Sequence, residues 1–265
     1  MTFSPRSIAV FDAGIGSYAI VDLIRSRARA QKIVYLADRA SFPYGSKTKA
    51  EMLSTMKKTV GFLETYDPDA IVLASNAPSI MVLDELRSYS KIPIFGVEPP
   101  LRQAIQQSTS KHVAILGVKS LIESSELRSF VDRNADEAKS VRLVNASPLV
   151  DLVENGKFLF SPKETQDIVN RFMLDQDAIN PDTDAFTLSS THLPWLKSFF
   201  ERSLPNANFL DPAEAIVAKL PLNKSDEDGH TRCLVTESTE HKAVDFQRML
   251  DCLRISLPIE IVKID

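Results

Sequence analysis

The chain has little of several features that mark particular classes of protein. Only two cysteines occur in 265 residues, Cys233 and Cys252, so neither a disulfide framework nor a cysteine metal cluster is expected. Both lie in apolar segments near the C-terminus, and we expect two reduced, buried thiols. No apolar run approaches the roughly 20 residues that a membrane helix needs, and the first residues lack the basic start of a signal peptide. The sequence therefore predicts a cytoplasmic protein with no membrane partner.

Basic residues are not in excess either. The formal net charge is −4 at pH 7, whereas a nucleic-acid surface needs concentrated Lys and Arg to neutralise phosphates. The cluster Arg25, Arg27 and Arg29 is typical of a solvated helix face. We expect no nucleic-acid partner. With 44% apolar and 25% charged residues, the composition is that of a globular protein long enough for about two domains.

Short apolar, β-branched runs alternate with longer segments of helical period. This alternation predicts parallel βαβ units and hence an α/β fold. The strands are expected at Ile8–Phe11, Ile33–Leu36, Ile71–Ala74, Ile94–Val97, Val113–Gly117, Val141–Val144, Ala185–Leu188, Arg232–Val235 and Ile259–Val262. Ser46 is the expected N-cap of the helix after the second strand.

Prolines suggest two places where the chain passes between domains. Pro93, Pro99 and Pro100 bracket one short strand, and a second candidate junction lies at 204–211. We therefore expect one domain from residues 1–98 plus 211–265, and another from 99–210.

Residues that directly follow the strands are the candidates for chemistry, because ligands of open α/β sheets bind beyond the carboxyl ends of the strands. Four segments qualify: FDAGIG from Phe11, PYGS from Pro43, ASNA from Ala74, and SSTH from Ser189. Read alone, Gly14 to Ala19 fits a dinucleotide-binding fingerprint, with Asp38 as the ribose acid. Against this reading, Asp12 would place a carboxylate beside the pyrophosphate.

Taken together, these segments resemble the glutamate racemases of the aspartate/glutamate racemase superfamily. FDAGIGS resembles the family's FDSGVGG, the block YLADRASFPYGS its YLGD and PYG blocks, and VLASNAPS its VxACNTAS. LVENG from Leu152 and LSSTHLP from Leu188 resemble its LVE and LGCTHYP. The resemblance implies two similar parallel-sheet α/β domains facing each other across a cleft that binds an amino acid or small carboxylate. It also implies cofactor-independent interconversion of L- and D-glutamate for peptidoglycan synthesis, with no metal and with a possible homodimer.

The family reaction uses two thiols on opposite faces of the substrate, and the resemblance places Ser75 and Ser190 at those positions. A thiol with a reference pKa near 8.5 supplies thiolate near neutral pH, whereas a serine hydroxyl is far less acidic. The resemblance also implies supporting catalytic roles for Asp12, Glu154 and His192. It implies a substrate shell made of Ala13, Pro43, Tyr44, Gly45, Ser46, Asn76, Ala77, Val118, Leu121 and Thr191.

Four shell positions have lost a hydroxyl that the family carries: Ala13, Ala77, Val118 and Leu121. We therefore expect a ligand that is less polar than glutamate around its α-centre, such as a dicarboxylate or aryl acid.

Simpler interpretations stay open: Asp12 as a turn cap, His192 as a strand-end histidine, and Glu154 as a surface acid. The sequence leaves several functions open. It favours a racemase-like protein that has lost the two-thiol activity. The three alternatives are an active racemase that uses Asp12 and His192 as bases, a non-catalytic binding or regulatory protein, and a nucleotide-binding Rossmann protein.

Overall fold

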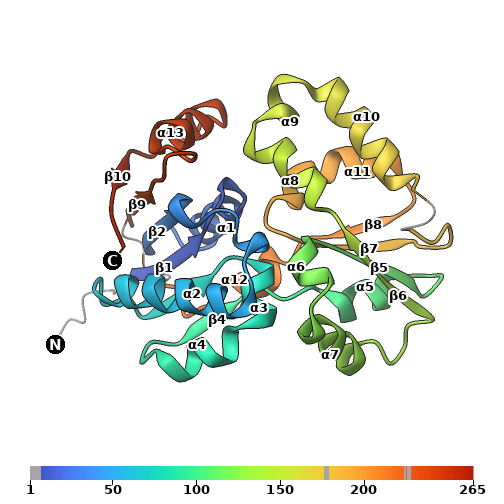
Figure 1. The fold of residues 1–265 in the computed structure, drawn as a ribbon, viewed down its shortest axis with the longest axis horizontal. Helices are drawn as coiled ribbons and strands as arrows, with labels where there is room; N and C mark the ends of the chain where they lie inside the picture. Colours follow the sequence, from blue (N-terminus) through green and yellow to red (C-terminus); the bar gives the residue numbers. More distant parts are fainter. Residues whose placement is uncertain (1–6, 176–178, 224, 226–227, 265) are drawn as a thin grey trace. The chain divides into compact units, whose positions relative to one another are not determined.

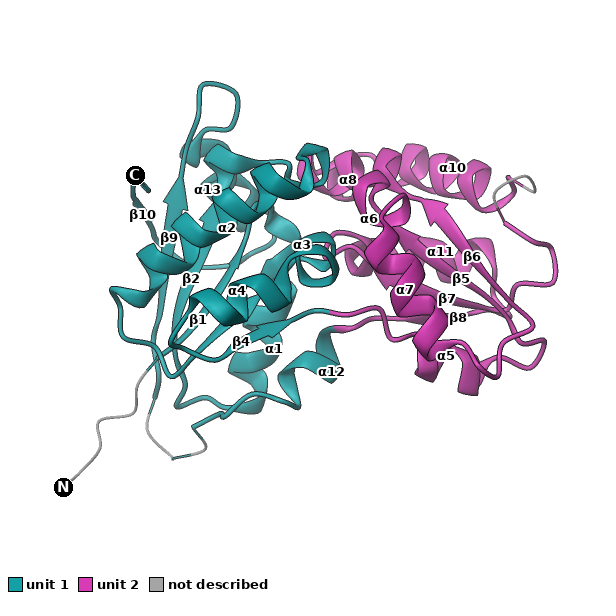
Figure 2. Cartoon of the chain, turned by 60° about the horizontal axis from the view of Figure 1, so that its bottom comes forward, with its two compact units in different colours: residues 1–97, 213–265 teal, residues 98–212 magenta. Residues whose placement is uncertain are grey.

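The computed structural model describes residues 7–175, 179–223, 225 and 228–264. The chain divides into two compact units, residues 1–97 with 213–265 and residues 98–212 (Figure 2). Each unit contains one parallel sheet with helices packed against it (Figure 1). Among the helices in the described part of the chain, none combines the length and hydropathy that crossing a bilayer requires.

The first unit contains a sheet in which the strands are ordered β10-β9-β2-β1-β3-β4, all described pairs being parallel. These strands are β1 (Ser7–Asp12), β2 (Lys32–Asp38), β3 (Ala70–Leu73), β4 (Ile94–Gly96), β9 (Thr231–Thr236) and β10 (Ile259–Ile261). β1, β2 and β3 are buried over almost their whole length, as expected for strands covered on both faces. Phe11 pairs with Leu36 on one side and with Leu73 on the other, so the three strands end together.

Two groups of helices cover this sheet. α1 packs against α12, and α2 packs against both α3 and α4. The helices are α1 (Tyr18–Arg27), α2 (Lys49–Glu64), α3 (Asn76–Met81), α4 (Leu83–Tyr89), α12 (Ala213–Val217) and α13 (Ala243–Cys252).

The second unit repeats the plan with a smaller parallel sheet, ordered β6-β5-β7-β8. Its strands are β5 (His112–Gly117), β6 (Ser140–Asn145), β7 (Ala185–Ser189) and β8 (Asn208–Leu210). Figure 1 shows α8 to α11 on one side of this sheet, with α5 and α7 on the other. The helices are α5 (Leu101–Gln107), α6 (Lys119–Ile122), α7 (Ser125–Asn134), α8 (Ser147–Glu154), α9 (Lys157–Phe160), α10 (Pro162–Met173) and α11 (Lys197–Ser203).

The predicted class of two parallel-sheet α/β domains is confirmed, and all nine predicted strands are present. The sequence missed β8, which is three residues long and pairs only with β7. Length does not explain this, because β4 and β10 are equally short and were predicted. β8 lies within 204–211, which the sequence analysis interpreted as a junction between domains.

The predicted start of α2 is wrong by two residues. Thr48 is the N-cap: its side chain accepts a hydrogen bond from the Glu51 amide, and the Glu51 carboxylate accepts one from the Thr48 amide at 2.9 Å. Ser46 instead closes a short 3-10 turn (η3, Tyr44–Ser46) and donates its hydroxyl to the Pro43 carbonyl. The reciprocal bonds between Thr48 and Glu51 form a capping box that satisfies two backbone donors at the helix start. A Ser46 cap without such a partner would satisfy only one.

The expectation of two buried thiols is wrong for one of them. Cys233 is fully buried in β9, but Cys252 is exposed at the end of α13. In α13 the buried positions are Ala243, Phe246 and Leu250, so Cys252 falls on the solvent face. Burial raises the pKa of the Cys233 thiol to about 12, with a further contribution from Glu260.

Candidate functional site

In the first unit, the segments predicted to carry chemistry lie at the carboxyl ends of neighbouring strands. β2, β1 and β3 are adjacent in the sheet. Asp12 ends β1 and Ala13 follows it, both buried, while Ser75 ends the turn between β3 and α3. The η3 turn after β2 contacts α3. This edge of the sheet therefore carries the other residues predicted for this half: Pro43, Tyr44, Gly45, Ser46, Asn76 and Ala77.

Tyr44 is held in place by a buried carboxylate. Its hydroxyl donates to Asp38 Oδ2 at 3.0 Å, and Asp38, 2% exposed, also accepts from the hydroxyls of Thr236 at 2.7 Å and Thr59 at 3.4 Å. Burial raises the pKa of Tyr44 well above its ordinary value, and the carboxylates of Asp38 and Asp12 raise it further. Tyr44 is therefore a neutral hydrogen-bond donor at physiological pH.

This arrangement weakens the dinucleotide reading of the first glycine segment. Asp38, its proposed ribose acid, is already occupied by three hydroxyl groups from inside the unit. Gly14 has an extended backbone and leads into a 3-10 turn (η1, Ile15–Ser17), so α1 begins only at Tyr18. A pyrophosphate site of that type needs the glycines to open directly onto the helix N-terminus.

A buried arginine at the same edge was missed by the sequence analysis. Arg39 is 7% exposed, and its Nη1 donates to the Ala13 carbonyl at 3.3 Å. Its guanidinium lies 5.0 Å from the ring centroid of Phe42 and 5.8 Å from that of Phe246. The signal was its position immediately after β2, although nothing in the sequence indicated that two aromatic rings would bury it.

Asn76 is the buried amide of this half of the site. Its Nδ2 donates to the Val97 carbonyl at 3.2 Å, which fixes the orientation of the amide because a carbonyl only accepts. The Oδ1 atom is buried and accepts no hydrogen bond from the described residues. A buried acceptor without a partner costs about 1–3 kcal/mol of folding free energy. A ligand that donates a hydrogen bond to Asn76 Oδ1 would therefore bind more tightly than one that does not.

In the second unit, the predicted residues lie at the ends of the adjacent strands β5 and β7. Val118 follows β5, and Ser190, Thr191 and His192 follow β7 and lead into a 3-10 turn (η4, Leu193–Leu196). All three residues after β7 are at least nine-tenths buried. Leu121 is fully buried, and its side chain lies over Gly117 at the end of β5.

Glu154 and His192 form a buried pair in this unit. His192 Nε2 lies 2.6 Å from Glu154 Oε1, and the two side chains are 7% and 6% exposed. The interpretation of Glu154 as a surface acid is therefore wrong. α8, which ends at Glu154, packs against the η4 turn that follows His192, and this packing turns the carboxylate inward. A carboxylate holding one imidazole nitrogen fixes the ring, an arrangement that supports acid–base chemistry.

The two serines at the implied thiol positions differ in exposure, but both hydroxyls lack a hydrogen-bond partner among the described residues. Ser75 is half-buried and Ser190 is 7% exposed. Neither hydroxyl forms a hydrogen bond with another residue of the described ranges. A serine becomes a nucleophile or base only when a neighbouring base accepts its proton. The described part of the chain places no such base in a bond with either hydroxyl.

Comparison with known proteins agrees with the fold and the strand-end geometry. Residues 16–220 match the family described as Asp/Glu/Hydantoin racemase. The glutamate racemase of Brucella anthropi is 32% identical over 235 residues, covering 85% of this chain and 83% of that protein. The crystal structure of glutamate racemase from Thermus thermophilus in complex with beta-chloro-D-alanine has a TM-score of 0.81 at 26% identity, covering 98% of this chain and 97% of that one.

The structure of glutamate racemase from Francisella tularensis in complex with D-glutamate has the same fold, with a TM-score of 0.81 at 23% identity and 98% of each chain covered. Fold and sequence thus point to one class, the racemases with two parallel-sheet α/β units. The chain belongs to the Asp/Glu/hydantoin racemase family and, within it, to the glutamate racemase family.

Proposed function

We propose that this member of the glutamate racemase family binds a small carboxylate and does not racemise glutamate by the two-thiol route. One observation carries the proposal: serine stands at positions 75 and 190, and within the described ranges neither hydroxyl is bonded to a base. General acid–base groups each contribute about 10² to 10⁴ in rate. Without thiolates, both the group that removes the Cα proton and the group that returns one are missing.

A carboxylate ligand is supported by the ligands of related structures, and a hydrogen-bond donor on that ligand is supported by Asn76. Related structures were solved with D-glutamate and with beta-chloro-D-alanine, both amino acids. In this chain the Asn76 Oδ1 atom is a buried acceptor without a donor among the described residues. We therefore infer a ligand that carries a hydroxyl or ammonium donor beside its carboxylate, rather than a plain dicarboxylate or aryl acid.

A second candidate function is racemisation by Asp12 and His192 acting as the two bases. The buried Glu154–His192 pair favours it, because Glu154 orients an imidazole at the end of β7. Asp12 is also buried, at 3% exposure, at the end of β1. This candidate predicts exchange of the glutamate Cα proton, which the first candidate does not.

The ligand proposal is tested by thermal unfolding in the presence of matched acids. Glutarate and 2-hydroxyglutarate differ only in the donor that Asn76 would accept, and both glutamate enantiomers complete the set. A ligand at 100 times its dissociation constant stabilises the folded state by about 2.7 kcal/mol. We expect 2-hydroxyglutarate or glutamate to raise the unfolding temperature more than glutarate does.

Variants identify where that stabilisation arises. Asn76→Ala should remove the difference between the hydroxy acid and glutarate, and Thr191→Val should weaken binding of every acid. Asn206→Ala, an exposed change in the second unit, is the matched control and should bind like the parent. If no acid stabilises the protein, or if the shifts survive both Asn76→Ala and Thr191→Val, the proposed ligand site is wrong.

A further inference from the structure

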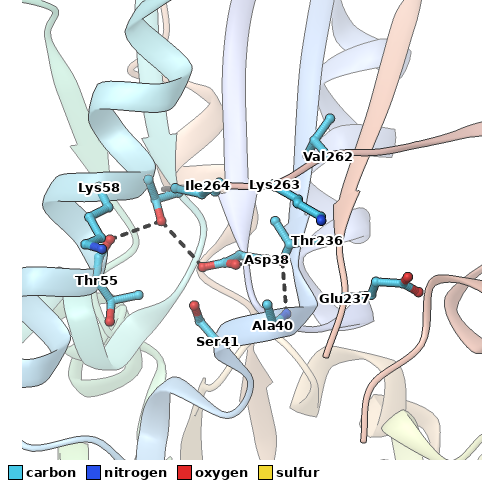
Figure 3. A pocket seen from close by; sticks show the side chains of 11 residues that line it. Asp38, Ala40, Ser41, Thr55, Lys58, Thr236, Glu237, Val262, Lys263 and Ile264 are labelled. Atoms are coloured by element: carbon cyan, nitrogen blue, oxygen red, sulfur yellow. Dashed lines mark hydrogen bonds between the residues drawn. The ribbon is translucent and has the colours of Figure 1, made fainter. Parts of the chain in front are cut away.

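A cavity of about 400 Å³ lies in the first unit at the carboxyl ends of β2 and β9, beside the segment that follows β10 (Figure 3). Its volume falls within the range of small-molecule sites, roughly 300–1,000 Å³. It is lined by Asp38, Ala40, Ser41, Thr55, Lys58, Thr59, Thr236, Glu237, Val262, Lys263 and Ile264. None of these residues belongs to the site that the resemblance to racemases implies.

Four hydrogen-bond donors on its wall have no partner within the described part of the chain. The ammonium groups of Lys58 and Lys263 and the hydroxyls of Ser41 and Thr55 make no hydrogen bond or ion pair with another described residue. They come from three separate parts of the unit: the turn after β2, helix α2, and the segment after β10. Figure 3 shows them around one space, with Lys58 and Thr55 on α2 and Lys263 on the opposite wall.

The two carboxylates of the cavity, in contrast, both accept hydrogen bonds from the first unit. Asp38 accepts three hydroxyl hydrogen bonds and is 2% exposed. Glu237 Oε2 accepts from the Ala243 amide at 3.1 Å, at the start of α13, and Figure 3 shows its side chain turned away from Asp38. The described residues therefore offer a ligand several unused donors, and the charges of Lys58 and Lys263 balance those of Asp38 and Glu237.

We propose that this cavity binds the phosphate group of a small phosphorylated molecule. A phosphate carries about −1.5 to −2 charges near pH 7 and three strong acceptor oxygens, which match two ammonium groups and two hydroxyls. Lysine is a point-charge ligand for phosphate and needs no bidentate geometry. Ala40, Val262 and Ile264 give the same space an apolar wall, which suits the organic part of a phosphomonoester. The inference does not rest on the proposed racemase-site function.

The test is a titration followed by amide NMR signals, with inorganic phosphate and glycerol 3-phosphate as probes and chloride holding ionic strength constant. We expect saturable shifts at Ser41, Lys58 and Lys263 with both probes, because the phosphate group is shared. Tighter binding of glycerol 3-phosphate would identify a phosphomonoester as the ligand class, whereas equal affinity would identify free phosphate. The double variant Lys58→Gln with Lys263→Gln should lower the affinity for either probe at least tenfold.

Lys91→Gln is the matched control, because Lys91 is also exposed and in the first unit but does not line the cavity. It should leave the affinity unchanged, and Asn76→Ala should do the same, which separates this cavity from the proposed carboxylate site. Absence of saturable shifts in the parent protein would overturn the proposal. An equal loss of affinity in Lys91→Gln would also overturn it, because binding would then reflect general surface charge.

Discussion

Replacing Asp38 by alanine should destabilise the first unit and release Tyr44. The Asp38 carboxylate is the acceptor for Tyr44, Thr236 and Thr59, which connect the η3 turn, β9 and α2. Its loss would remove the carboxylate oxygen to which the Tyr44 hydroxyl donates. The η3 turn would then lose its buried anchor to the sheet.

The size of the effect follows from which hydroxyls lose their acceptor. Thr59 also donates to the Thr55 carbonyl at 3.1 Å, so it stays satisfied. Tyr44 and Thr236 each lose an acceptor, and a buried unsatisfied polar group costs about 1–3 kcal/mol. Removing a buried carboxylate returns part of its desolvation penalty. We therefore expect a loss of about 2–4 kcal/mol in the free energy of unfolding.

Urea unfolding monitored by circular dichroism measures this loss, with Asp22→Ala as the control, because Asp22 is exposed on α1. A second readout is specific to the network: the pKa of Tyr44 should fall towards its ordinary value, since Asp38 is one of the groups that raise it. A tyrosine absorbance titration follows that change. An Asp38→Ala stability within about 0.5 kcal/mol of Asp22→Ala, the range of ordinary surface changes, would refute the reasoning.

Three further outcomes are expected. Ser75→Cys combined with Ser190→Cys should recover little racemisation, because the other hydroxyl donors that the resemblance implies would still be absent; robust activity would show that only the thiols matter. At pH 8 a thiol reagent should modify exposed Cys252 rapidly and buried Cys233, with its pKa of about 12, only after unfolding; rapid modification of both would contradict the structure. Burial opposes ionisation of Asp184, but hydrogen bonds from a serine hydroxyl and backbone amides outweigh it and lower its pKa. Stability from this group is present above an unfolded pKa of about 3.9 and is lost as the pH falls through the lower folded value. In Asp184→Asn the free energy of unfolding should therefore fall less steeply as the pH is lowered below about 4. A pH dependence equal to that of the parent protein would exclude this role.

Much of the fold could be predicted because its signals are local. The alternation of buried strands and amphipathic helices predicted nine strands, all of which are present. The strand-end rule led to the segments after β1, β2 and β3, which are adjacent strands of one sheet. Where local signals competed, the choice failed. Ser46 and Thr48 are both good N-caps, and only the capping partner Glu51 decides between them.

Contacts between distant segments could not be predicted from the sequence. The burial of Glu154 depends on α8 packing against the turn after β7, and Arg39 is buried by Phe42 and by Phe246, which is 207 positions away in the chain. Thr236 was overlooked although it ends β9, where the strand-end rule would have found it. Its bond to Asp38 joins residues 198 positions apart.

Exchange of the Cα proton of glutamate shows whether the protein can racemise this substrate. The protein is incubated with L- and with D-glutamate in D₂O, and the Cα proton signal is followed by NMR beside a sample without protein. We expect no enzymatic exchange of either enantiomer, because no base among the described residues is bonded to Ser75 or Ser190. Ready exchange would contradict this expectation, and loss of that exchange in His192→Gln would assign the chemistry to the Glu154–His192 pair.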